Sequence, residues 1–216
     1  MKKLSLITLA SVLCVSLSYS QEGGSQKWSA GLNAGVNSSL TEDIALLPGG
    51  SLNFKGNVQY KLKSNFGLML NLCFGTLDTE KTAGAKTNLL ASSFEITYNL
   101  EGVFNTSKFG LLLHAGPGLS TMWNPDMQAV NPSDSYLKGQ DDMITLNLGV
   151  MPSYKISDNW NLILDFSLVG NFLQDHSFDY SATPKQKSLL FSSSIGLNYT
   201  FGKVTSRVNP IKEKTK

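Results

Sequence analysis

The sequence predicts an all-β fold, an eight-stranded antiparallel up-and-down β-barrel that crosses a membrane. Three observations predict it. Apolar residues alternate with small polar residues in eight stretches, and alternation with a period of two indicates a strand with two unlike faces. The connections between the stretches are alternately short and long. The apolar face of the stretches carries no Asp, Glu, Lys or Arg, as a lipid environment demands.

The clearest stretch covers residues 188–201, with the sequence SLLFSSSIGLNYTF. From Leu189 to Phe201 every second residue is large and apolar or aromatic, apart from Ser193, whereas the residues between are mostly small or polar. Its length exceeds that of a typical soluble strand and fits a tilted strand that crosses a bilayer. We expect this strand to close the barrel.

Seven further stretches repeat the pattern, and the eight together give the even number that single-chain bacterial barrels use. The expected strands are residues 27–37, 51–62, 66–75, 88–101, 109–123, 143–156, 160–172 and 188–201. The short connections are 63–65, 102–108 and 157–159, and the long ones are 38–50, 76–87, 124–142 and 174–187. Short turns typically face the periplasm and long loops the outside, which places both termini on the periplasmic side.

Aromatic residues give an independent indication of membrane position. One lies on the apolar face near the short-turn end of each strand, which predicts a periplasmic aromatic girdle. Its members are Trp28, Tyr60, Phe66, Tyr98, Phe109, Tyr154, Trp160 and Tyr199. A sparser ring near the loops is expected from Phe74, Trp123, Phe172 and Phe191.

The chain divides into a signal peptide at 1–20, the barrel at 21–201 and a polar basic tail at 202–216. Lys2 and Lys3 precede an apolar run, and Ser18-Tyr19-Ser20 has the small-residue pattern of a cleavage site. Removal of the signal leaves Cys73 as the only cysteine, so no internal disulfide is expected. The net charge of +2 gives no footprint for nucleic acid.

Several charged residues alternate onto the inward face. They are Lys55, Lys61, Glu95, Glu101, Lys155 and Asp165, with His114 among them. We expect Lys55 to pair with Glu95 or Asp165 near mid-barrel, because buried charges need partners. A self-satisfied polar plug is favoured over a charge-lined pore, since an eight-stranded lumen is only wide enough for side chains to fill it.

Two prolines conflict with regular pairing. Pro117 and Pro152 fall inside the fifth and sixth strands, and proline donates no hydrogen bond to a ladder. We expect bulges or irregular pairing there, with Gly116 and Gly118 supplying backbone freedom.

Two other classes of protein fit the pattern less well. A soluble lipocalin-like binder would turn the apolar face inward, but its outer face would normally carry more Lys and Glu. A lipid-modifying enzyme at the barrel rim would need an activated nucleophile, and the loop candidate is Asp175-His176-Ser177 with Asp179. The sequence shows no metal-ligand spacing and no phosphate-binding glycine loop, so we expect no catalytic site, metal or cofactor.

Three segments carry a resemblance to a known family: GLNYTFG at 196–202, AGPGLS at 115–120 and KTNLLASSFEITYNL at 86–100. In them the chain resembles OmpA-like outer-membrane β-barrels, most of all the versions found in Bacteroidetes-type envelopes. The resemblance implies insertion into the cell outer membrane by the barrel-assembly machinery, which reads an aromatic-ended last strand, here Tyr199 and Phe201. Many members carry a second domain that grips peptidoglycan. The chain ends fifteen residues after Phe201, so we expect neither that domain nor its role here.

We therefore expect a monomeric outer-membrane barrel with a structural or surface-interaction role carried by its loops, of which 124–142 is the longest. Its partners would be outer-membrane lipids and an unidentified surface ligand. A small, porin-like solute channel is the alternative function.

Overall fold

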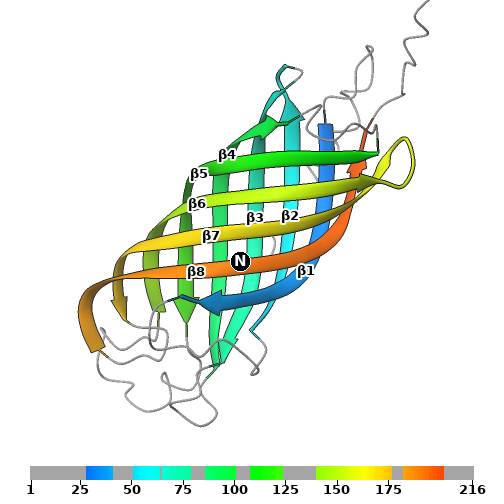
Figure 1. Ribbon diagram of the computed structural model, residues 1–216. Coiled ribbons are helices and arrows are strands. Elements are labelled where there is room, and N and C mark those ends of the chain that lie inside the picture. Colours follow the sequence, from blue (N-terminus) through cyan, green and yellow to red (C-terminus); the bar gives the residue numbers. More distant parts are fainter. Residues whose placement is uncertain are drawn as a thin grey trace, which may run out of the picture.

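Eight antiparallel strands form a closed barrel in the computed structural model, in which neighbours along the chain pair and β1 pairs with β8 (Figure 1). The strands are β1 (Trp28–Ser39), β2 (Leu52–Lys61), β3 (Phe66–Asp78), β4 (Lys86–Asn99), β5 (Phe109–Trp123), β6 (Gln140–Lys155), β7 (Trp160–His176) and β8 (Ala182–Thr200). The structure describes residues 28–40, 51–63, 65–78, 86–100, 108–123, 140–176 and 182–201. Among these residues, no helix has the length and apolar character needed to cross a membrane. The predicted fold class is confirmed.

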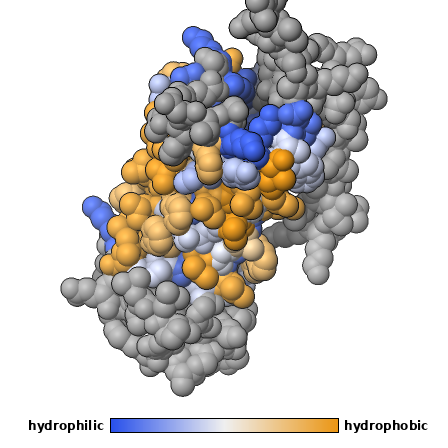
Figure 2. Space-filling view, turned by 45° about the vertical axis from the view of Figure 1, so that its right-hand side comes forward, coloured by the Kyte–Doolittle hydropathy of each residue, from blue (hydrophilic) through white to orange (hydrophobic). Residues whose placement is uncertain are grey.

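The outside of the barrel is apolar and its inside is largely polar. Leu32 on β1 and Phe54 on β2 are 77% and 59% exposed, whereas Asn53 and Lys55, on either side of Phe54, face inward and are buried. Figure 2 shows apolar side chains gathered in a broad band over the middle of the barrel. Exposed apolar surface of this extent is unfavourable in water, so it indicates a surface covered by lipid.

Both prolines interrupt a ladder without forming a bulge, so the expectation of bulges or irregular pairing is confirmed in its second form. Beside Pro117, the β4–β5 ladder lacks two pairs, yet Ser93 pairs with Gly118 and Ile96 with Ala115 in the same register. Pro117 itself pairs with Leu146 on β6. The proline therefore turns its missing donor toward β4 and leaves the other ladder intact.

Pro152 behaves in the same way. It pairs with Leu111 on β5, and the gap falls on its β7 side, between the pairs Val150 with Phe166 and Ser153 with Ile163. These two pairs share one register. Each proline thus removes a few residue pairs from one ladder and leaves the register of the strands unchanged.

The register does shift near the loop end of the β7–β8 pair, where alternation in the sequence breaks down. Phe172 and Leu173 are adjacent apolar residues, and Leu173 has a positive φ of 62°. The irregularity turns Leu173 outward, where it is 62% exposed, and brings Gln174 inward, where it is fully buried. A bulge thus restores the correct faces after a slip in the pattern.

Six strands reach further at the loop end than predicted. β1, β3, β4, β6, β7 and β8 continue to Ser39, Asp78, Lys86, Gln140, His176 and Ala182, so the β7–β8 pair extends to His176 and Ala182 (Figure 1). Polar residues at these ends hide the alternation, although backbone pairing needs no apolar face to continue.

Candidate functional site

Four charged or titratable side chains meet in the middle of the lumen. The Nζ atom of Lys55 on β2 lies 2.9 Å from Oδ2 of Asp165 on β7. Oδ1 of Asp165 lies 3.4 Å from Nε2 of His114 on β5, whose Nδ1 lies 2.5 Å from Oε2 of Glu95 on β4. Each of the four side chains is less than a tenth exposed. We call this set the ion cluster.

Neutral side chains complete the bonding of both carboxylates. Ser167 donates to Oδ1 of Asp165 at 2.5 Å, and Ser93 and Asn71 donate to Oε1 of Glu95 at 2.6 and 2.9 Å. Buried charges are tolerated when they are paired and hydrogen-bonded. The ion cluster therefore closes the mid-lumen as a polar layer in which both carboxylates are bonded and Lys55 pairs with Asp165, whereas Nε2 of His114 has no hydrogen bond.

A glycine makes room for the histidine. Gly149 on β6 lies directly across the ladder from His114. A Cβ atom at position 149 would overlap the His114 ring and would lie 2.8 Å from the carbonyl oxygen of Phe166. The absence of a side chain at Gly149 thus leaves room for the imidazole in its position between the two carboxylates.

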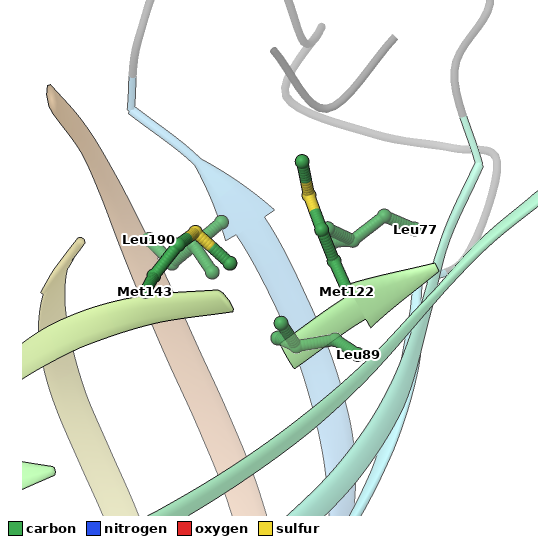
Figure 3. Packing of buried hydrophobic residues seen from close by; sticks show 5 residues of the cluster. All are labelled: Leu77, Leu89, Met122, Met143 and Leu190. Carbon is green, nitrogen blue, oxygen red and sulfur yellow. The ribbon is translucent and has the colours of Figure 1, made fainter. Parts of the chain in front are cut away.

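Two apolar clusters flank the ion cluster inside the barrel. The loop-side cluster takes one residue from each of five strands: Leu77, Leu89, Met122, Met143 and Leu190 (Figure 3). The turn-side cluster consists of Met69, Met151 and Ile163, with Leu112 packed against it. Neither cluster was predicted from the sequence. Their signal was the inward position of Met69, Met122, Met143 and Met151 in the alternation, because flexible methionines fill irregular interior gaps.

A cavity of about 270 Å³ opens at the short-turn end of the lumen, and we call it the vestibule. Its lining includes Leu112, Met151 and Ile163 of the turn-side cluster. A second void, of about 50 Å³, lies between the ion cluster and the loop-side cluster and is lined by Lys55, Asp165 and Leu190, among others. The lumen is thus divided into compartments by packed side chains.

The other inward charges do not join the ion cluster. Lys61 lines the vestibule, and Lys155 lies 2.8 Å from Asp158 in the turn after β6. Glu101 lies outside the described residues. The structure thus brings together Lys55, Glu95, His114 and Asp165 of the seven predicted residues.

The eight aromatics predicted near the short turns form four cross-strand pairs. Ring centroids lie 4.6 Å apart for Trp28 and Tyr60, 4.9 Å for Phe66 and Tyr98, 5.0 Å for Phe109 and Tyr154, and 4.9 Å for Trp160 and Tyr199. Tilted pairs at this distance add about 0.5–1.5 kcal/mol beyond burial. The pairs therefore stabilise every second pair of neighbouring strands at the short-turn end of the barrel. Near the loops, Phe74 pairs with Trp123, and Phe191 stacks on Phe166.

Other candidate chemistry is sparse in the part of the chain that the structure describes. Within it, no group of three or more His, Cys, Asp or Glu side chains is placed to hold a metal ion, and Cys73 is a free thiol. For the loop candidate Asp175-His176-Ser177 with Asp179, no side chain is described. No reaction is assigned to it.

A closed antiparallel barrel with an apolar outside and a filled polar inside defines the class of membrane-spanning β-barrels. The family model of the outer membrane protein β-barrel domain matches residues 7–201. The chain therefore belongs to this family, and its strands are transmembrane strands of the outer membrane.

A solved structure shares this fold. Neisserial surface protein A has a TM-score of 0.56 at 15% identity, covering 83% of this chain and 100% of its own. Ail, the attachment invasion locus protein of Yersinia pestis, has a TM-score of 0.48 at 9% identity, covering 81% of this chain and 97% of its own. A major outer membrane protein from Thermus thermophilus has a TM-score of 0.49 at 12% identity, covering 81% of this chain and 98% of its own. No curated protein matches the chain significantly. At these identities the likeness concerns the fold alone.

Proposed function

We propose that this protein is a closed, non-conducting OmpA-like barrel whose structural or surface-interaction role is carried by its long loops. The observation that carries the proposal is the filled lumen. The ion cluster and two apolar clusters succeed one another along the barrel axis, and each is built from side chains less than a tenth exposed. A solute would have to break apolar packing twice and a buried ion pair once, so a role in transport is disfavoured.

The orientation and export route are part of the proposal. Residues 1–20 would direct export, the short turns would face the periplasm, and the basic tail 202–216 would lie there too. The connections at the other end, including 124–139, lie outside the described residues. Insertion by the barrel-assembly machinery and a monomeric state are expected, as in a Bacteroidetes-type envelope.

Planar-bilayer recording tests the closed lumen. The purified protein, shown to be folded by its heat-dependent shift in electrophoretic mobility, should give no steady conductance above that of the empty bilayer. The physical reason is the layered packing of the interior. Steady, ohmic conductance from the same folded preparation would instead establish the channel alternative.

Replacement of residues 125–138 by a short Gly-Ser linker tests the role of the loops. Loops on a rigid barrel tolerate such changes and carry binding function. The variant should keep its heat-dependent mobility shift, while bacteria that produce it should lose adherence to epithelial cells relative to producers of the wild-type protein. Equal adherence of the two strains, with equal amounts of protein at the surface, contradicts a role for this loop in attachment.

A further inference from the structure

The vestibule has the features of a binding site, and neither the family nor the proposed loop function assigns it one. It opens at the end of the barrel opposite the long loops and holds about 270 Å³. Pockets for drug-sized ligands typically hold about 300–1,000 Å³, so the vestibule suits a smaller molecule. The turn-side cluster closes it below, which makes it a dead-end pocket.

Neutral polar groups form the wall of the vestibule. Amides of Gln59, Asn161 and Asn198 and hydroxyls of Thr97 and Ser153 come from five different strands. Amides and hydroxyls both donate and accept hydrogen bonds, so together they match a ligand that carries several hydroxyl groups.

The charges of the wall argue against an ionic ligand. Lys61 alone is charged among the described residues that line the vestibule. It already has an interaction of its own, so we assign it no role in binding. An uncharged ligand needs no countercharge and leaves Lys61 in its existing contact.

One wall residue has an unused bonding group. Asn198 on β8 is 7% exposed, and its Oδ1 atom has no hydrogen-bond partner. It lies across the ladder from Gly31, which offers no side chain, and from Asn161, which also lines the vestibule. A buried acceptor without a partner costs about 1–3 kcal/mol, so a rotation of the Asn198 amide that turns Oδ1 to the vestibule would let a ligand donor satisfy it.

The floor of the vestibule, formed by the turn-side cluster and Leu112, favours a ligand with an apolar group. Leu112, Met151 and Ile163 present hydrocarbon and thioether surface below the polar wall. A ligand that matches the wall and the floor carries hydroxyl groups and a small apolar group, and an amide N–H would supply the donor that Oδ1 of Asn198 lacks. We propose that the vestibule binds an uncharged N-acetylated hexosamine, with the acetyl methyl group on the floor and the hydroxyl groups on the wall. The sugar is either free or the end residue of a glycan chain.

Methyl NMR of the full-length folded protein in lipid nanodiscs tests this proposal, because nanodiscs avoid detergents with sugar headgroups. Labelled methionine and isoleucine methyls place reporters on the floor, Met151 and Ile163, and on the loop-side cluster, Met122 and Met143. Titration with N-acetylglucosamine should shift the floor signals and leave the loop-side signals in place. A dissociation constant on the order of 1 mM is expected for so small a ligand. Glucose, which lacks the acetyl group, should bind several-fold more weakly.

Two leucine variants and a control assign the site. Asn198→Leu and Asn161→Leu should each weaken binding by about three- to tenfold through loss of a hydrogen bond. Asn147→Leu makes the same change at an inward position outside the vestibule and should leave binding unchanged. If Asn198→Leu fails to fold, Asn161→Leu and the titration of the wild-type protein still show whether the vestibule binds the sugar.

The remaining comparison separates the two sources of the sugar. The tetramer of N-acetylglucosamine should bind more tightly than the monomer if the ligand is a chain end, and equally if it is the free sugar. Unshifted floor signals at saturating monomer and tetramer, equal binding of glucose, or unchanged binding by both vestibule variants would overturn the proposal.

Discussion

Two walls of the same lumen bond their polar groups to different extents. Neither wall is uniform, because His114 Nε2 and Thr145 Oγ1 lack a hydrogen-bond partner on β5 and β6, and Asn53 on β2 bonds to Asn37 and Ser192. On the wall that includes β4 and β7, Glu95 and Asp165 each accept several bonds, and His114 bridges them. On the β8–β1–β2 wall, Asn33 has neither amide atom bonded, and Asn57 Oδ1 and Ser194 Oγ have no hydrogen-bond partner. The carboxylates are thus fully paired, whereas several neutral groups are left without protein partners.

The difference follows from the cost of leaving each kind of group unpaired. An isolated buried charge costs far more than an isolated buried amide, and a neutral amide can be satisfied by a single water molecule. The first wall should therefore be sensitive to substitution and the second tolerant.

The largest effect is expected from Asp165→Leu. The substitution leaves the Lys55 ammonium group buried without its carboxylate, and breaking one side of a buried ion pair costs about 3–5 kcal/mol. The free energy of unfolding, measured in urea from lipid vesicles, should fall by that amount. Adding Lys55→Met to the same chain should recover most of the loss, since both charges are then gone. A double variant as unstable as Asp165→Leu alone would contradict the pairing.

Alternation in the sequence was sufficient to predict the eight strands and the two faces, because a period of two maps directly onto inward and outward positions. It left the partner of Lys55 open between Glu95 and Asp165. Residues 110 positions apart meet through the stagger of a closed barrel, and a single strand carries no information on that stagger.

The ladder gaps, the bulge and the strand ends were not predicted in full, because the local alternation of apolar and polar residues does not determine them. At Pro117 the missing donor was foreseen, but whether a gap or a bulge absorbs it depends on which neighbour the donor would face. At Leu173 the adjacent apolar pair with Phe172 is compatible both with a bulge and with the end of the strand, and the predicted strand ends at Phe172. At the polar strand ends no alternation marks how far the strand continues.

A smaller effect is expected from Gly149→Ala on the sensitive wall. The new methyl group overlaps the His114 ring and the backbone at Phe166, and overpacking of this kind costs about 1–3 kcal/mol. Gly56→Ala is the matched control, because its Cβ atom would meet only Leu32, at 3.7 Å on the outer face. The control should stay within about 0.5 kcal/mol of wild type in the same urea experiment. Equal stabilities of the two variants would show that His114 does not lie against Gly149.

The smallest effect is expected on the tolerant wall, and a pair of asparagines measures it directly. Asn71→Leu removes a donor to the Glu95 carboxylate and should cost about 1–3 kcal/mol. Asn33→Leu removes an amide with no protein partner and should change the free energy of unfolding by less than about 1 kcal/mol. Both substitutions replace an inward amide by the same apolar side chain, so their difference isolates the bonding of the amide. If Asn33→Leu costs as much as Asn71→Leu, ordered water holds the Asn33 amide as firmly as protein holds Asn71. The two walls would then differ in the partners of their polar groups, and would be equally sensitive to substitution.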